Sequence, residues 1–182
     1  MKRYYSNYST YRRPNYYRAR TKWSTNFAEG TLRLEVPANQ TTGSYAIVCS
    51  NPAQTQNTVS QPFTAARVKL DIQAVTENAE DAQYLGNVKV GIFYVTQGYA
   101  VSNAIFREHP EWLMGYKFLG EPIIDQSGSA TILRPFIVST TLKRKLQTGD
   151  AIYLVIAAYN SDTANARTIR FNYTARWWTK AN

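Results

Sequence analysis

The sequence predicts an all-β fold, because several stretches alternate polar and apolar residues with a period of two. The clearest of these stretches are residues 31–36, 67–74 and 169–177. Successive side chains of a strand point to opposite faces, so such alternation is typical of strands with one buried face. The chain shows no regular succession of strand and helix patterns, which argues against parallel βαβ units.

Eight strands are expected along the chain. They cover residues 31–36, 44–49, 67–74, 87–95, 113–119, 129–138, 151–159 and 169–177. The stretch 151–159 is apolar throughout and lies between turn residues, which predicts a strand covered on both faces. Pro135 places the strand at 129–138 at a sheet edge or a bulge, because proline cannot donate a ladder hydrogen bond.

One helical segment is expected at residues 102–112, as an insertion between strands. Ser102 and Asn103 can cap a first turn, and Pro110 can begin a second one. The connections 50–63 and 76–86 are polar and of unequal length. Such connections favour an eight-stranded antiparallel jelly-roll sandwich with a short helical loop insertion. An immunoglobulin-like sandwich is the alternative, but it predicts a shorter chain and no basic arm.

Positive charge is concentrated at the N-terminus. Of the 182 residues, 21 are Lys or Arg and 12 are Asp or Glu, a formal net charge of +9. Residues 1–26 hold seven of these basic side chains and no acidic one, so the rest of the chain is nearly neutral. The sequence therefore predicts a basic arm at residues 1–28 and a folded domain at residues 29–182.

The arm has the composition of a nucleic-acid-binding segment. It contains six of the chain's 14 tyrosines, interleaved with arginine and lysine. Guanidinium groups pair with phosphates, and both arginine and tyrosine stack on unpaired bases. The arm residues expected to bind nucleic acid are Lys2, Arg3, Arg12, Arg13, Tyr16, Tyr17, Arg18, Arg20 and Lys22.

The folded domain offers further candidates for the same interface. They are the cluster Lys143, Arg144 and Lys145, together with Arg170 and Arg176 on one face of the last strand. The alternative for the cluster is a solvated loop before a strand. Trp177 and Trp178 are consecutive, so on a strand one fills the core while the other can meet a partner.

Catalysis, metal binding and membrane insertion find little support. His109 and Cys49 are the only residues of their kinds. We expect His109 at the surface or at an interface and Cys49 in the core, and we expect no catalytic residue, metal or cofactor. The acidic pairs Glu80–Asp81 and Glu108–Glu111 lie in loop-like sequence and are expected to be solvated or at an interface. The longest apolar run has nine residues, whereas a membrane span needs about 20, and no secretory signal is apparent.

Residues 141–150, Thr-Leu-Lys-Arg-Lys-Leu-Gln-Thr-Gly-Asp, followed by the apolar strand 151–159, carry a family resemblance. They resemble the segment before the penultimate strand in capsid proteins of circovirus-like, small circular single-stranded DNA viruses. The resemblance implies a single jelly roll, sixty copies in a T=1 icosahedral shell, and an arm that binds packaged DNA and acts as a nuclear localisation signal. It also implies residence in the virion and, during assembly, in the host nucleus, with a host receptor and nuclear import factors as possible partners. The arm departs from that family in being short and rich in tyrosine.

Three alternatives remain open on the sequence. Coat proteins of small satellite RNA viruses share the size, the arm and the fold. A monomeric nucleic-acid-binding β-barrel would carry its basic and aromatic residues on a concave sheet face. A carbohydrate-binding or hydrolytic jelly roll lacks a recognisable set of catalytic or metal-binding residues here.

Overall fold

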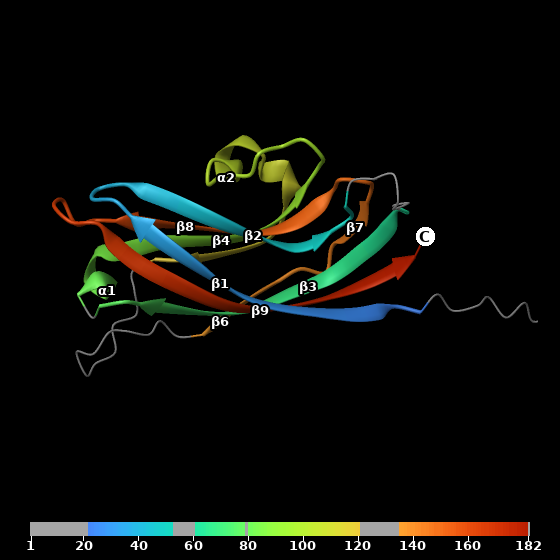
Figure 1. The fold of residues 1–182 in the computed structure, drawn as a ribbon, viewed down its shortest axis with the longest axis horizontal. Coiled ribbons are helices and arrows are strands. Elements are labelled where there is room, and N and C mark those ends of the chain that lie inside the picture. The colour runs from blue at the N-terminus through green and yellow to red at the C-terminus, as the bar shows by residue number, and fades with distance from the viewer. Residues whose placement is uncertain (1–21, 53–60, 79, 121–134, 182) are drawn as a thin grey trace, which may run out of the picture.

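The computed structural model of this chain describes residues 22–52, 61–78, 80–120 and 135–181 (Figure 1). Two short helices, α1 (Asp81–Tyr84) and α2 (Ile105–Glu108), and a 3-10 turn, η1 (Pro110–Trp112), are found there. The remaining elements of this part of the chain are nine strands. They are β1 (Ser24–Val36), β2 (Thr41–Ser50), β3 (Phe63–Thr76), β4 (Leu85–Val95), β5 (Leu113–Leu119), β6 (Phe136–Ser139), β7 (Lys143–Leu146), β8 (Ala151–Asn160) and β9 (Arg167–Ala181).

The strands form two antiparallel sheets that pack face to face. One has the order β1-β9-β3-β6, with β7 also paired to β3, and the other has the order β2-β8-β4-β5. Four of the pairs are nested: β1 with β9, β2 with β8, β3 with β6, and β4 with β5. A chain folded once into a long hairpin and then rolled up gives this nesting, which defines the jelly roll. The predicted fold class is therefore confirmed.

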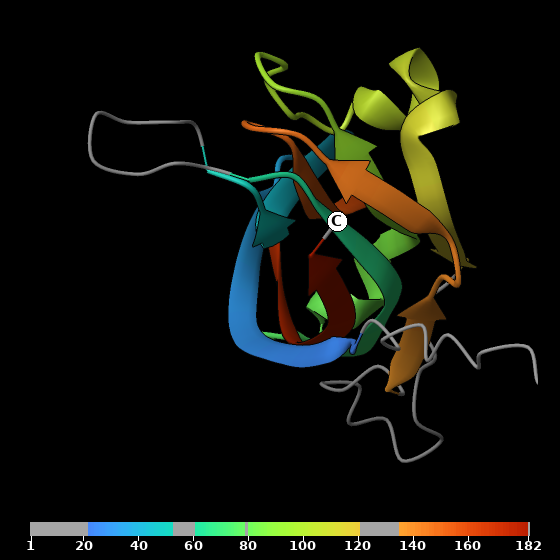
Figure 2. The same cartoon turned by 90° about the vertical axis from the view of Figure 1, so that its right-hand side faces the viewer.

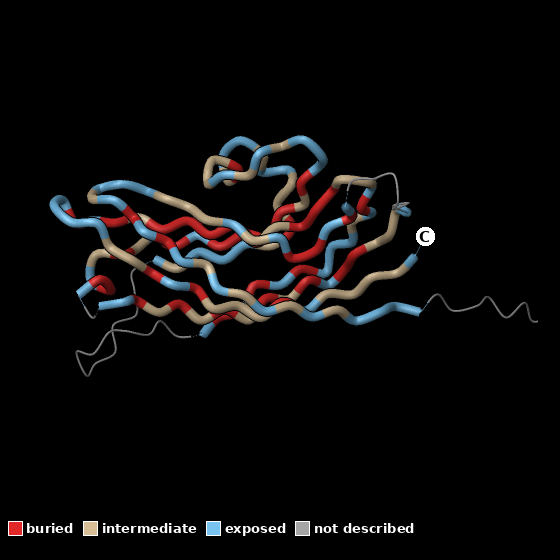
Figure 3. Tube along the Cα trace, viewed as in Figure 1, coloured by how far each residue is buried: buried red, intermediate tan, exposed pale blue. Residues whose placement is uncertain are grey.

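The core lies between the two sheets, as the buried stretches of Figure 3 show. Leu70 and Ile72 of β3 and Leu154 and Ile156 of β8 are each at most 1% exposed. Inward and outward residues alternate along β3, so the period-two pattern of the sequence decides which side chains fill this core.

The helical insertion covers the outer face of the second sheet. Figure 2 shows α2 against that sheet, on the side away from β1 and β9. Phe93 of β4, Val155 of β8 and Ile105 of α2 are buried together in a second, smaller cluster. This cover explains why β8 is apolar throughout, since its alternate side chains enter two different clusters, as the sequence predicted.

Three local features differ from the expected elements. β7 is an additional strand of four residues that the sequence did not predict. Three of the four are cationic and only Leu146 is buried, so the stretch lacks the alternation of apolar residues by which a strand is recognised. The connection 76–86 contains helix α1. β1 begins at Ser24, within the segment assigned to the arm, because the long strand β9 pairs with it as far as Thr179. Of the strand expected at 129–138, the part before Pro135 lies outside the described residues.

The expectation that Glu80 and Asp81 are both solvated is wrong for Asp81. Its side chain is 3% exposed and lies 3.1 Å from the guanidinium group of Arg167. Arg167 also contacts Asp162 at 2.6 Å and lies over the ring of Tyr84. The Arg167 guanidinium, 12% exposed, is thus paired with two carboxylates, which offsets its loss of hydration and fixes α1 against the start of β9.

The contribution of Asp162 to this network can be tested by measuring stability as the pH is lowered. Hydrogen bonds from the backbone N–H of Ala164 and from Arg167 lower the pKa of Asp162 to about 2, from an ordinary value of 3.8. A carboxylate with a lowered folded-state pKa stabilises the fold above its unfolded pKa, and this contribution is lost as the pH falls. We expect the urea midpoint to fall between pH 4 and pH 2, and to fall less in Asp162→Asn. An equal fall in the two proteins would contradict the assignment.

Candidate nucleic-acid interface

One end of the first sheet gathers basic and aromatic side chains on its outer face. The start of β1, the end of β9, the start of β3 and strand β7 meet there. The cross-strand register places two rows of residues on this surface: Thr25, Trp178, Ala66 and Lys143, and then Lys180, Thr64 and Lys145. The N-terminal segment joins the sheet at this same end, through Lys22 and Trp23.

We call the five cations of this region the basic end. They are Lys22, Arg67, Lys143, Lys145 and Lys180. Among the described residues, none of the five has a carboxylate partner within 4.0 Å, whereas Arg33, Lys69 and Arg176 on the same face are ion-paired. Unpaired cations gathered on one surface repel one another, and a polyanion relieves that repulsion. The basic end is therefore a cluster of positive charge that is not balanced by acids of the described chain.

Two tryptophans form a pocket within the basic end, which we call the indole pocket. Its volume is about 300 Å³, and its lining residues are Trp23, Thr25, Ala66, Arg67, Lys143 and Trp178. The ammonium group of Lys180 lies 5.4 Å from the centroid of the Trp23 ring, in a cation–π contact that helps to hold the indole in place. Trp23 is 38% exposed, so part of a large apolar ring faces solvent beside three cations.

Arg67 reaches this pocket through an irregular backbone. The β3–β9 register shifts between Ala66 and Lys69, and Arg67 has a φ of 53°. The other non-glycine residues with positive φ in the described chain are Asn39 and Asn87, and asparagine tolerates that region better than arginine. A bulge of this kind re-aims a side chain at the cost of backbone strain.

The predicted residues of β9 lie on the outer face, but at some distance from the basic end along the strand. Arg176 donates a hydrogen bond to Asp71 at 2.8 Å, so its charge is already paired. Arg170 is exposed opposite Arg33, which itself contacts Glu77 at 2.7 Å. Both arginines therefore stand beside acids, and the charge there is mixed.

The predicted cluster on β7 divides between the two faces of the strand. Lys143 and Lys145 are exposed on the outer face, but Arg144 pairs in register with the fully buried Ala65. The Arg144 guanidinium lies 5.6 Å from the centroid of the Tyr94 ring, and its Nε is buried. Arg144 is therefore separated from the basic end, because the strand alternation that exposes its two neighbours turns it inward.

The arm candidates before Lys22 lie outside the described residues. These are Lys2, Arg3, Arg12, Arg13, Tyr16, Tyr17, Arg18 and Arg20. Sequence reasoning did not select Trp23, Arg67 or Lys180. The position of Trp23 directly after Lys22, the last cation of the basic segment, was a usable signal, whereas Arg67 sits in a regular alternating pattern that gives no sign of the bulge. The predicted opposite directions of the two tryptophans are confirmed: Trp177 packs against the core and Trp178 lines the indole pocket.

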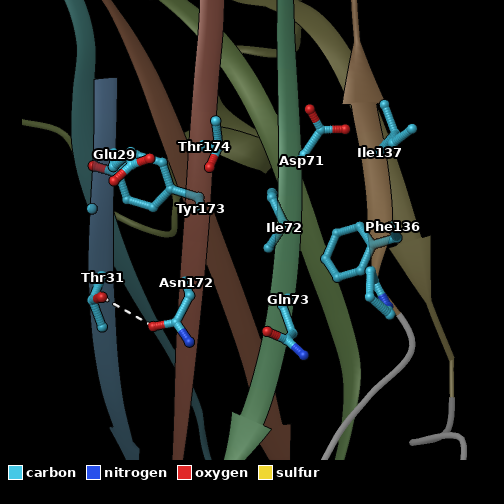
Figure 4. A pocket seen from close by; sticks show the side chains of 12 residues that line it. Glu29, Thr31, Asp71, Ile72, Gln73, Phe136, Ile137, Asn172, Tyr173 and Thr174 are labelled. Carbon is cyan, nitrogen blue, oxygen red and sulfur yellow. Dashed lines mark hydrogen bonds between the residues drawn. The ribbon is translucent and has the colours of Figure 1, made fainter. Parts of the chain in front are cut away.

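A groove of about 730 Å³, lined by both polar and apolar side chains, crosses the middle of the same face. Figure 4 shows Glu29, Asp71, Gln73 and Asn172 among its lining residues, with a hydrogen bond from Thr31 to Asn172. The hydrogen bond from Arg176, helped by Lys69, lowers the pKa of Asp71. A general acid needs a raised pKa, so this groove does not favour a hydrolase with Asp71 as its acid.

His109 and Cys49 occupy structural positions. The ring of His109 stacks on Trp112 at 3.9 Å between centroids, and its Nδ1 lies 2.8 Å from Glu111. Cys49 is 7% exposed, as expected for a core residue, and burial raises the pKa of its thiol to about 11. In the described part of the chain, no helix is long and apolar enough to cross a membrane. The same residues contain no group of three or more His, Cys, Asp or Glu placed to hold a metal ion.

Comparisons with known proteins find distant matches among solved structures. No protein family and no curated protein matches the sequence. Among solved structures, the empty head of turnip yellow mosaic virus is 16% identical, over 87% of this chain and 82% of that chain, with a TM-score of 0.36. A lipoprotein from Bacteroides thetaiotaomicron is 11% identical over 86% of both chains, with a TM-score of 0.38. VP1 of trichodysplasia spinulosa-associated polyomavirus, solved with 3'-sialyllactose, is 10% identical over 88% of this chain and 80% of that chain, with a TM-score of 0.11. All three TM-scores are below 0.5.

Replacement of Lys143 and Lys145, the outer-face lysines of β7, tests whether the basic end binds nucleic acid. For single strands, the logarithm of affinity falls with the logarithm of salt concentration by about 0.7 per phosphate contact. We expect Lys143→Ala with Lys145→Ala to weaken binding of a 20-nucleotide single strand and to flatten this slope by up to about 1.4. Fluorescence anisotropy across a series of salt concentrations measures both the affinity and the slope.

The matched control is Arg33→Ala with Arg170→Ala, which removes two cations from the same face outside the basic end. We expect a smaller change of slope in this variant. Equal changes in the two variants would mean that only net charge matters.

Proposed function

We propose that this chain is the subunit of a self-assembling protein shell that packages single-stranded nucleic acid. In this proposal the jelly roll forms the wall, and the arm at residues 1–28 together with the basic end contacts the cargo. The observation that carries this proposal is that four cations of the sheet, Arg67, Lys143, Lys145 and Lys180, have no carboxylate partner among the described residues and lie where the basic arm joins the sheet through Lys22. The arm and the sheet thereby offer one continuous basic surface.

The separation of charge suits an assembling subunit. Outside residues 1–26 the chain has 14 basic and 12 acidic side chains, so neighbouring walls would repel one another little. At nine charges per subunit, a shell of sixty copies brings about 540 formal positive charges, enough to neutralise on the order of 540 phosphates. Most such contacts are to phosphates, so packaging is largely independent of sequence.

The finer parts of the proposal rest on the family resemblance of residues 141–159. They are a T=1 shell of sixty copies, circular single-stranded DNA as cargo, and an arm that also directs nuclear import before assembly. Coat proteins of satellite RNA viruses would share the wall and the basic surface but carry RNA.

Particle size and absorbance test the proposal directly. We expect the purified full chain to form uniform closed particles in electron micrographs, with a 260/280 nm ratio well above that of protein alone. DNase and RNase digestion of the extracted cargo then separates DNA from RNA. A small monodisperse species under every salt and pH condition would overturn the assembly claim and favour a monomeric nucleic-acid-binding module.

The arm arginines provide a second test. We expect replacement of Arg12, Arg13, Arg18 and Arg20 by Ala to lower the packaged nucleic acid per particle by roughly half, because the net charge per subunit falls from nine to five and each removed cation leaves a phosphate unneutralised. The 260/280 nm ratio of purified particles measures this loss. Replacement of the same four residues by Lys keeps the charge and is the control. Particles of the Ala variant with full cargo would refute the role of the arm.

A further inference from the structure

We infer that the indole pocket binds one unpaired base of the packaged strand. This inference rests on the proposed function and adds a ligand to one place on the basic end. Phosphate contacts alone do not distinguish single strands from duplexes, whereas a site for an exposed base does so through stacking. The pocket therefore makes the subunit selective for single-stranded cargo.

The chemistry of the lining fits a nucleotide. Trp23 and Trp178 bring two indole rings to a pocket of about 300 Å³, at the lower end of the range for small ligands. Among the described residues Trp178 has no aromatic partner, so its ring is not already stacked. Base stacking on such rings is tolerant of sequence, because every base has a π-face.

The cations that line the pocket favour an anionic ligand over a cationic one. A tryptophan cage by itself would also suit a quaternary ammonium group. Arg67 and Lys143 line this pocket, and neither has a carboxylate partner among the described residues, so a cationic ligand is repelled. A base with a phosphate on each side meets both requirements, with its ring against the indoles and its phosphates against the two cations.

The backbone at Arg67 supports the same assignment. Arginine is held at a φ of 53° by the bulge in β3, although a regular strand would avoid this strain. Strain of this kind persists where the surrounding structure fixes a functional side chain. The buried Ala66 forms the floor beside it, and its small side chain leaves the space open.

The position of Trp23 connects the pocket with the arm. Trp23 directly follows Lys22 and precedes the first residue of β1, and Lys180 lies against its ring. A base in the indole pocket therefore lies where the bound nucleic-acid strand would pass from the arm to the sheet. Phosphates on its two sides can then meet arm cations and β7 lysines respectively.

The inference is tested by comparing two oligonucleotides with the same number of phosphates, one with bases and one without. The full chain is titrated with a fluorescent 12-nucleotide deoxythymidine strand and with an abasic strand of the same length and phosphate count. We expect the thymidine strand to bind about 10-fold or more tightly in the wild type, in line with the energy of base stacking on aromatic rings. In Trp23→Ala we expect that ratio to fall several-fold, with little change in affinity for the abasic strand.

Phe27→Ala is the matched control. Phe27 is 58% exposed on the same face of β1 but does not line the pocket, so its removal should leave the ratio unchanged. A ratio in Trp23→Ala equal to that of the wild type would overturn the pocket and leave nucleic-acid binding intact. Failure of the wild type to bind either strand would instead overturn the proposed function itself.

Discussion

The pairing of β9 on both of its edges is the constraint on which the rest of the structure depends. Of its 15 residues, 13 pair with β1 along one side and 12 pair with β3 along the other, so the direction of its side chains is fixed from both edges. Ile169, Phe171 and Ala175 are thereby buried in the core, while Arg170 and Arg176 are exposed. A slip of one residue would exchange these two sets, which gives the register a strong energetic preference.

The same constraint separates the chemistry of the two surfaces of this sheet. Its inner surface is apolar and closes the core against the second sheet. Its outer surface carries paired charges along most of its length and unpaired cations where the arm joins it. The bulge in β3 interrupts the regular ladder beside that end and brings Arg67 next to the two indoles. A rigid wall and a cationic, aromatic site are thus built from one set of strands.

Much of the fold could be predicted, because period-two alternation reports burial directly. It located the strands, the double burial of β8 and the opposite directions of Trp177 and Trp178. The candidate site could be predicted only in part. Lys143 and Lys145 were found by their charge, but Arg144 was grouped with them, although its register partner Ala65 shows that it faces inward. Asp81 looked solvated because its partner, Arg167, lies 86 positions along the chain.

The all-β class, the faces of the long strands and the concentration of charge in the first 26 residues follow from local pattern and composition. Which distant residues meet depends on how the strands pair in the folded chain. This pairing brought Trp23 and Trp178 to one pocket and added Arg67 through a bulge that the regular pattern of β3 does not reveal. The reason is physical: alternation fixes the direction of a side chain relative to its own strand, whereas strand pairing and register fix its neighbours.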